Sequence, residues 1–196
     1  MVTINGLRRF LNAHRRYVAD IATSYKQFRK NRQNDQSFYQ LEPSNSRQIT
    51  AQELDAVIFL TLRNTHHLVS KNFVQRRWDR GAFGYLKQVA GSFRNQILVD
   101  EATDFSVVQL ACMKHLASPQ TQSFFACGDF NQRITSEGIH KQEQLAWISN
   151  KLNKRTIKAV YRQSQKLNEF AKHLLAHVGG DEEAVGELPE NYNHQG

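Results

Sequence analysis

The sequence predicts an α/β fold in which a basic helical region precedes a parallel sheet. In the first half of the chain apolar residues recur at steps of three and four, whereas in the second half short apolar runs alternate with helical segments. The charge changes with the pattern, because residues 1–97 hold 16 Lys and Arg against 6 Asp and Glu, and residues 98–196 hold 10 against 12. We therefore expect a helical basic region (1–95), an α/β region (96–178) and an acidic tail or linker (179–196).

The composition limits the class of protein. The chain has 196 residues, of which 40% are hydrophobic and 22% are charged, as in globular proteins with a core of their own. Two cysteines exclude a disulfide scaffold, and no apolar run approaches the length of a membrane span. With no signal peptide, we expect a cytoplasmic protein without a membrane partner. The net charge of +8 permits binding to nucleic acid without requiring it.

The first predicted element is one long helix. From Ile4 to Phe28 apolar residues form a heptad seam of 25 residues, which is typical of a helix packed lengthwise on another helix. His14 lies on the seam and is interpreted as a packed core residue. The basic residues lie mostly off the seam, either as a solvated face or as a face that follows nucleic-acid phosphates, and they include Arg8, Arg15, Arg16 and Arg29.

Shorter elements complete the helical region. Thr50 stands three residues before Glu53, which is a capping box, and the helix that it starts continues to about Ser70. One or two short helices follow, broken near Gly81 and Gly84.

Strands and helices then alternate. The strands are expected to be buried on both faces, which would make Cys127 a small core residue. The expected strands are 96–99, 123–127 and 156–160, and the expected helices are 106–117, 142–152 and 164–177.

Polar residues follow all three expected strands, at the edge where parallel sheets bind ligands. Asp100 and Glu101 follow the first strand as in the Walker B pattern, in which the Asp holds Mg²⁺ and the Glu activates water, although a simple polar turn is an alternative. Gln132 follows the second strand as a neutral group able to sense phosphate. Arg162 follows the third strand, where it is able to reach a bound phosphate. We expect these clusters to converge at one edge.

These segments resemble motifs of superfamily 1 helicases of the UvrD/Rep/PcrA kind. Residues 98–104 (Leu-Val-Asp-Glu-Ala-Thr-Asp) are similar to motif II, 128–134 (Gly-Asp-Phe-Asn-Gln-Arg-Ile) to motif III, and 160–164 (Val-Tyr-Arg-Gln-Ser) to motif IV. The intervals of about 25 to 30 residues also agree. The resemblance implies a partial RecA-like sheet of the P-loop NTPase type, preceded by the later part of the helical 1B subdomain.

The resemblance also implies roles for individual residues. Asp100 would bind Mg²⁺, with Glu101 beside it as the catalytic base. Gln132 and Arg162 would contact the γ-phosphate of ATP, the arginine as an arginine finger. Aromatic residues around motif III stack on DNA bases in this family, and the candidates here are Phe130 and Trp147.

Two departures from the family bear on activity. Thr103 replaces the usual Gln of motif II, which puts hydrogen bonding around that motif in question. No glycine in these 196 residues is followed by lysine, so the P-loop is absent, and the segment from Gly81 to Lys87 has the wrong spacing. Motifs V and VI are absent as well.

The sequence therefore predicts a fragment of an ATP-dependent DNA helicase that is inactive alone and binds neither ATP nor Mg²⁺ tightly. The resemblance implies a bacterial or phage-like protein that is associated with the nucleoid. Its partners would be single-stranded or partly duplex DNA and the missing helicase domains. One alternative is a truncated or degenerate module that binds DNA or a protein without hydrolysing ATP. Another is a basic α/β domain whose motif matches arise by chance.

Overall fold

The computed structural model shows a mostly helical chain with a small parallel sheet, which confirms the α/β prediction at this coarse level. The chain forms two compact units, 1–150 and 151–196, which we describe separately. Within the described part of the chain, no helix is long and apolar enough to cross a membrane. The structure describes residues 13–32, 49–130, 138–157, 164–179 and 185–187.

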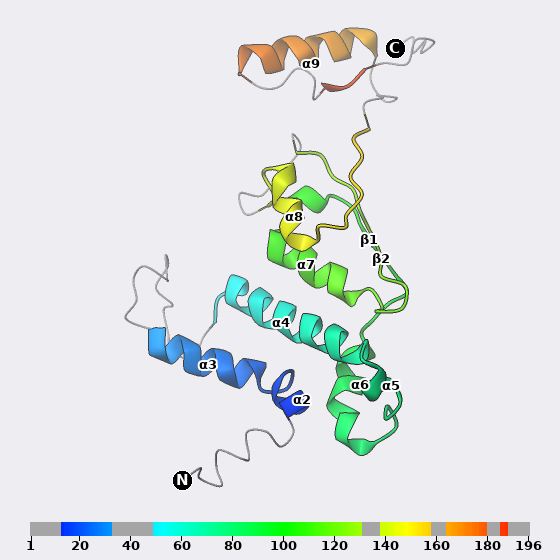
Figure 1. Ribbon diagram of the computed structural model, residues 1–196. Coiled ribbons are helices and arrows are strands. Elements are labelled where there is room, and N and C mark those ends of the chain that lie inside the picture. The colour runs from blue at the N-terminus through cyan, green and yellow to red at the C-terminus, as the bar shows by residue number, and fades with distance from the viewer. Residues whose placement is uncertain (1–12, 33–48, 131–137, 158–163, 180–184, 188–196) are drawn as a thin grey trace. The chain divides into compact units, whose positions relative to one another are not determined.

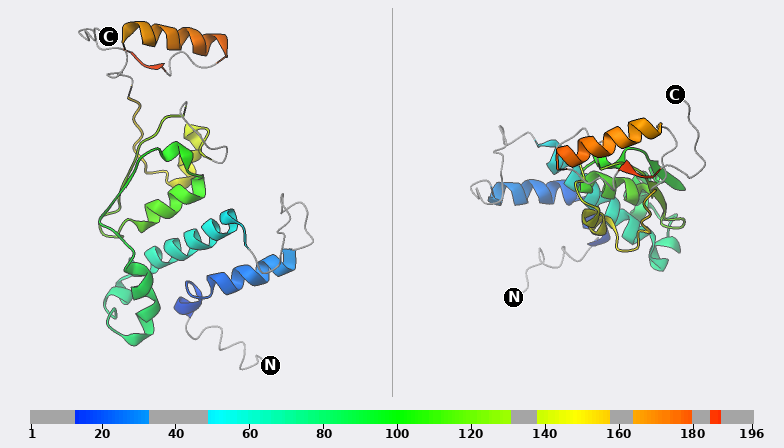
Figure 2. Two further views of the ribbon diagram at one scale, coloured as in Figure 1. Left: turned by 180° about the vertical axis from the view of Figure 1, so that it is seen from behind. Right: turned by 90° about the horizontal axis from the view of Figure 1, so that it is seen from above.

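Three helices lie side by side in the first unit, with α4 (Ala51–Val69) between α3 (Ile21–Arg32) and α7 (Val107–Leu116) (Figure 1). The view from behind in Figure 2 shows the same order. Thr50 starts α4 through the predicted capping box: its hydroxyl accepts from the Glu53 N–H at 3.2 Å, and its own N–H donates to the Glu53 carboxylate at 2.7 Å.

The prediction of one long first helix is wrong, because residues 17–20 form a turn between α2 (Ala13–Arg16) and α3. The Ile21 N–H donates to the Val18 carbonyl, which leaves the Tyr17 carbonyl without its helical donor. The Asn64 side chain of α4 donates to that carbonyl at 2.6 Å. Long-range packing and a side-chain donor therefore interrupt the heptad pattern.

A hydrophobic cluster holds this turn against the following helices. Val18, in the turn, is one of its buried members. Two short helices, α5 (Asn72–Gln75) and α6 (Gly84–Ala90), and the 3₁₀ turn η1 (Gly81–Phe83) confirm the expected short, interrupted elements. The buried members of the cluster are Val18, Leu68, Val74, Phe83 and Leu86.

The sheet consists of β1 (Gln96–Val99) and β2 (Ser123–Ala126), paired in parallel and joined by α7. Ser106, the first residue of the expected helix, caps α7 by accepting from the Gln109 N–H. The expectation that both faces would be buried is wrong. Leu98 and Phe125 are direct partners in the register, yet they are 67% and 57% exposed. The exposed positions show that one face of this two-stranded sheet is open to solvent.

The next helix is shorter than expected. Residues 142–144 form a 3₁₀ turn, η3, and α8 (Leu145–Ile148) ends at Ser149, whose φ of −169° and ψ of 137° are extended. The extended backbone at Ser149 ends the helix before residues 150–152. Residues 156–157 are not in a strand, and the rest of the expected third strand lies outside the described residues.

The second unit contains α9 (Gln165–His177), which Ser164 caps as predicted by accepting from the Leu167 N–H. Asn168 is 5% exposed and its side chain donates to the Gly186 carbonyl, so part of the acidic segment lies against α9. One face of α9 carries exposed apolar residues at helical spacing, namely Leu167, Phe170, Leu174 and Val178.

A buried ion pair joins α3 to the start of α4. Arg29 was expected on an open basic face, but its Nε lies 3.2 Å from a Glu53 carboxylate oxygen, and both side chains are about nine-tenths buried. The Tyr25 hydroxyl donates to the same carboxylate at 2.7 Å. Burial favours the neutral acid, but the Thr50 N–H, the Tyr25 hydroxyl and the Arg29 charge outweigh it and lower the pKa of Glu53.

Replacing Glu53 by Gln should remove the carboxylate that lies 3.2 Å from the buried Arg29 Nε, at a cost of about 3 kcal/mol at pH 7. Since the folded-state pKa of Glu53 lies below its ordinary value of 4.5, its stabilisation is present above pH 4.5 and is lost as the pH falls further. When urea unfolding is measured from pH 7 to pH 3, the free energy of unfolding of Glu53→Gln should therefore fall less with falling pH than that of the parent chain.

Asp79→Asn is the matched control, because it breaks an ion pair with Lys87 in which the aspartate is fully exposed. Its unfolding free energy should match that of the parent chain at every pH. An equal loss of unfolding free energy in both variants would contradict the assignment of a buried ion pair.

Candidate functional site

The carboxyl ends of β1 and β2 meet at one edge of the sheet. Val99 is paired with Ala126, so the acidic pair after β1 and the Gly128-Asp129 pair after β2 leave the sheet together. The predicted convergence is therefore confirmed for these two strand ends. Gln132 and Arg162, predicted to complete the site, lie outside the described residues.

Hydrogen bonds continue the contact beyond the strands. The Cys127 N–H donates to the Val99 carbonyl at 3.0 Å, and the Ala102 N–H donates to the Cys127 carbonyl at 2.8 Å. The buried Thr103 hydroxyl donates to the Asp129 carbonyl at 3.0 Å. Thr103 is the residue that departs from the helicase motif, and here it links the two strand ends directly.

Gly128 lets the two segments approach each other more closely than a side chain would allow. A Cβ atom at this position would lie 2.9 Å from the backbone nitrogens of Ala102 and Thr103, and 3.1 Å from the Thr103 hydroxyl. Two of these neighbours are backbone atoms, which cannot move away by a change of rotamer as a side chain can. The absence of a side chain at Gly128 is therefore a requirement of the site.

The acidic pair is exposed and its backbone is fixed. One oxygen of Asp100 accepts from the Glu101 N–H at 3.0 Å and from the Cys127 thiol at 3.2 Å. Glu101 has a φ of 50° and a ψ of 43°, a left-handed conformation that costs a non-glycine residue about 1 kcal/mol or more. The structure maintains this strain at the residue predicted to be the catalytic base.

Cys127 is not the core residue that the sequence suggested, because its side chain is exposed at the strand end. The hydrogen bond to Asp100 raises the pKa of the Cys127 thiol, with smaller contributions from burial and from the Asp100 and Glu101 charges. The thiol therefore stays protonated and serves Asp100 as a donor.

The residues present fit a magnesium ion held mainly by other ligands. The second oxygen of Asp100 accepts no hydrogen bond from the described residues and remains available to a hydrated ion. Mg²⁺ is commonly bound by one or two carboxylates, with water and phosphate oxygens as its other ligands. Among the described residues no group of three or more His, Cys, Asp and Glu side chains gathers into a metal site of its own. Tight binding here would require phosphate oxygens from a nucleotide.

The two predicted aromatic residues are both accessible. Phe130 follows the strand end and is 39% exposed, whereas Trp147 lies on α8 and is 55% exposed. The Trp147 ring also packs against Phe59 of α4, with centroids 5.2 Å apart. Trp147 lines an apolar cavity of about 330 Å³ together with Val107, Val108 and Gln144.

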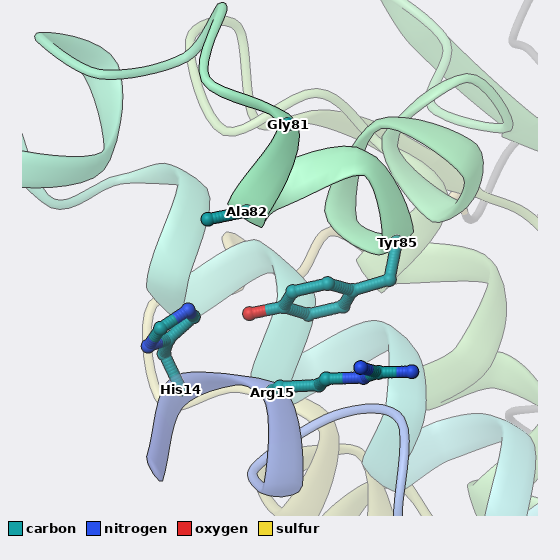
Figure 3. A pocket seen from close by; sticks show the side chains of 5 residues that line it. All are labelled: His14, Arg15, Gly81, Ala82 and Tyr85. Carbon is teal, nitrogen blue, oxygen red and sulfur yellow. The ribbon is translucent and has the colours of Figure 1, made fainter. Parts of the chain in front are cut away.

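The two described arginines of the predicted DNA surface have different surroundings. Arg16 lies 3.9 Å from Asp20, whereas Arg15 lines a second cavity, of about 280 Å³, between α2 and the start of α6 (Figure 3). Arg8 lies outside the described residues. The cavity is lined by His14, Arg15, Gly81, Ala82 and Tyr85, and we call it the α2–α6 pocket.

Tyr85 is a residue that the sequence reasoning missed. Its hydroxyl oxygen is buried and has no hydrogen-bond partner among the described residues. Burial raises the pKa of Tyr85 to about 12, although the nearby Arg15 charge opposes the shift, so the phenol remains a donor. Gly81, in the segment that lacks the spacing of a P-loop, lines the pocket. The close spacing of Gly81 and Gly84 was the signal in the sequence that pointed to this segment.

The comparisons with known proteins give no relative. No protein-family model, no curated protein and no solved structure matches the chain.

Gly128→Ala should force apart the segments after β1 and β2 and lower the free energy of unfolding by about 1–3 kcal/mol. Gly84→Ala is the matched control, since a Cβ there meets nothing within 4 Å and its φ of −54° and ψ of −38° are helical. Urea denaturation followed by circular dichroism should show a lower free energy of unfolding for Gly128→Ala alone. Equal stability of the two variants would contradict the close approach.

Proposed function

We propose that this chain carries half of the nucleotide site of an ATP-dependent DNA helicase or translocase similar to superfamily 1 enzymes, within a RecA-like sheet. The observation that carries the proposal is the in-register end of two parallel strands, which brings the Walker B-like pair and the motif III-like segment together. Thr103 and Gly128 tie these segments to each other. A simple polar turn after one strand would need neither this contact nor a strained Glu101.

In this proposal each residue has a limited task. Asp100 would hold a hydrated Mg²⁺ through its open carboxylate oxygen, while Cys127 and the Glu101 N–H orient the other oxygen. Glu101 would accept a proton from the attacking water. Gln132 and Arg162 would contact the γ-phosphate, as their matches do in helicases. Mg²⁺ would supply charge stabilisation to the phosphates when bound.

The site in this chain is incomplete. No Gly-Lys pair occurs in the 196 residues, so the backbone amides and lysine that hold ATP phosphates would come from polypeptide outside this sequence. Nucleotide binding by this chain should therefore be weak, and turnover should be absent.

Mn²⁺–ATP, with Mn²⁺ as a paramagnetic substitute for Mg²⁺, should broaden NMR signals at the carboxyl ends of β1 and β2 at millimolar concentration. Asp100→Asn should abolish the broadening, because an amide is a much poorer ligand for a hard cation. Asp79→Asn should keep it, since that carboxylate lies in the segment before η1. A phosphate-release assay on the same samples should show no turnover.

Broadening that persists in Asp100→Asn would contradict the assigned metal ligand. Robust ATP hydrolysis by the parent chain that Glu101→Gln abolishes would contradict the claim that the site is incomplete.

A second candidate function is a nucleic-acid-binding module without ATP hydrolysis. The observation that favours it is the basic surplus of the first half, together with Arg15, which forms no ion pair with the described residues. Both functions need contact with nucleic acid, and they differ in whether the nucleotide half-site is used.

The chain should bind a fluorescein-labelled 20-nucleotide oligothymidylate at 50 mM NaCl, and its affinity should fall steeply as NaCl rises to 200 mM. Phosphate contacts by Lys and Arg release counterions, so the logarithm of affinity should fall linearly with the logarithm of salt concentration. Fluorescence anisotropy measures this slope. Absence of binding at 50 mM NaCl would overturn both candidate functions.

A further inference from the structure

The α2–α6 pocket combines a positive charge with aromatic rings. Figure 3 shows the Tyr85 hydroxyl pointing toward His14, with the Arg15 side chain running beside the Tyr85 ring. The His14 ring lies 5.1 Å from Phe83 and 6.1 Å from Tyr85, measured between centroids. On the opposite wall Gly81 and Ala82 present little side-chain bulk, so the backbone there is open to a ligand.

Two polar groups of the pocket lack partners in the described structure. The Tyr85 hydroxyl is buried without a hydrogen bond, which is unfavourable for a group that can both donate and accept. The Arg15 side chain is exposed and forms no ion pair, unlike the neighbouring Arg16, which faces Asp20. The pocket thus holds a buried hydroxyl without a partner and an exposed cation along the same ring, and together they are suited to an acceptor that carries negative charge.

We propose that the α2–α6 pocket binds a backbone phosphate of single-stranded nucleic acid, with Arg15 and the Tyr85 hydroxyl as the two donors. Arg15 matches the charge of the phosphate and offers several N–H groups to its oxygens. The hydroxyl is covered in the free protein, so a side chain of the pocket would move to admit the phosphate.

Nucleic acid is favoured over a free phosphate ion or an acidic peptide by the other groups of the pocket. The His14 and Tyr85 rings stand next to the cation, and alternating cations and aromatic rings are typical of surfaces that bind single strands. The pocket also lies in the half of the chain that holds the whole basic surplus. The inference rests on the nucleic-acid binding proposed above and assigns that binding to the α2–α6 pocket.

Three variants test the pocket in the anisotropy assay at 50 mM NaCl. Arg15→Ala should weaken oligothymidylate binding about tenfold and reduce the salt slope by about one. Arg15→Lys should keep the slope and recover part of the affinity, because it retains the charge without the planar fork. Tyr85→Phe should weaken binding about tenfold without changing the slope, since it removes a hydrogen bond and no charge.

Thermal unfolding separates a binding role of Tyr85 from a structural one. Removing a buried hydroxyl that has no partner should raise the melting temperature of Tyr85→Phe while binding weakens. A lower melting temperature together with weaker binding would mean that the hydroxyl supports the fold, and would overturn the proposal. Arg94→Ala controls for the loss of one positive charge, because the Arg94 guanidinium donates to the Gly91 and Phe93 carbonyls. Arg94→Ala should change the affinity for oligothymidylate by less than twofold.

The outcomes distinguish this inference from the proposed function. If the parent chain binds oligothymidylate and the Arg15 and Tyr85 variants bind equally well, the pocket assignment fails and the proposed function stands. If the parent chain does not bind, both fail. Inorganic phosphate at matched ionic strength tests the source of the ligand: His14 ring NMR signals should shift with oligothymidylate at micromolar concentration and not with millimolar phosphate. The reverse pattern would overturn nucleic acid as the ligand.

Discussion

The parallel pairing of β1 and β2 is the constraint on which the rest of the first unit depends. Parallel strands cannot be joined by a tight turn, so the chain must cross over, and here α7 makes that crossing. A crossover helix has to bury its apolar face, and α4 provides the main surface against which α7 packs. The helical region is therefore part of the scaffold that positions the strand ends, and it is more than an appendage to them.

This dependence explains why local signals succeeded at some elements and failed at others. Helix starts were predictable because a capping box is a contact between residues three apart, as at Thr50 and Ser106. The same holds for β1 and β2, whose short apolar runs are bounded by polar residues. The acidic pair and Gly128 were found for the same reason, since each stands directly after its strand.

The errors come from contacts between residues far apart in the sequence. The first helix is broken because Asn64, 47 residues later, takes the Tyr17 carbonyl, and no pattern within residues 4–28 reveals this. Arg29 was misplaced on the surface because its partner Glu53 lies on another helix. Tyr85 and Arg15 come together only when α2 packs beside α6, so their pocket has no linear motif.

The two candidate sites use different physical means of recognition. At the strand ends, two carboxylates and a thiol donor form the site proposed for a cation with phosphate ligands of its own. In the α2–α6 pocket, an arginine and a phenol form the site proposed for direct contact with a phosphate. Both interactions would involve the phosphates of polyanions, one through a metal ion and the other through hydrogen bonds. Divalent ions should consequently favour binding at the strand ends and oppose it at the pocket by competing for the phosphate, whereas monovalent salt should weaken both interactions.

The open face of the sheet has a consequence for how this polypeptide behaves in solution. Leu98 and Phe125 lie opposite each other across β1 and β2 and present a contiguous apolar pair to water. Such a surface on a short sheet is a place where identical molecules adhere to one another as their concentration rises. The yield of purified protein should thus improve with dilution and mild detergent, and a charged residue at Phe125 should reduce the self-association.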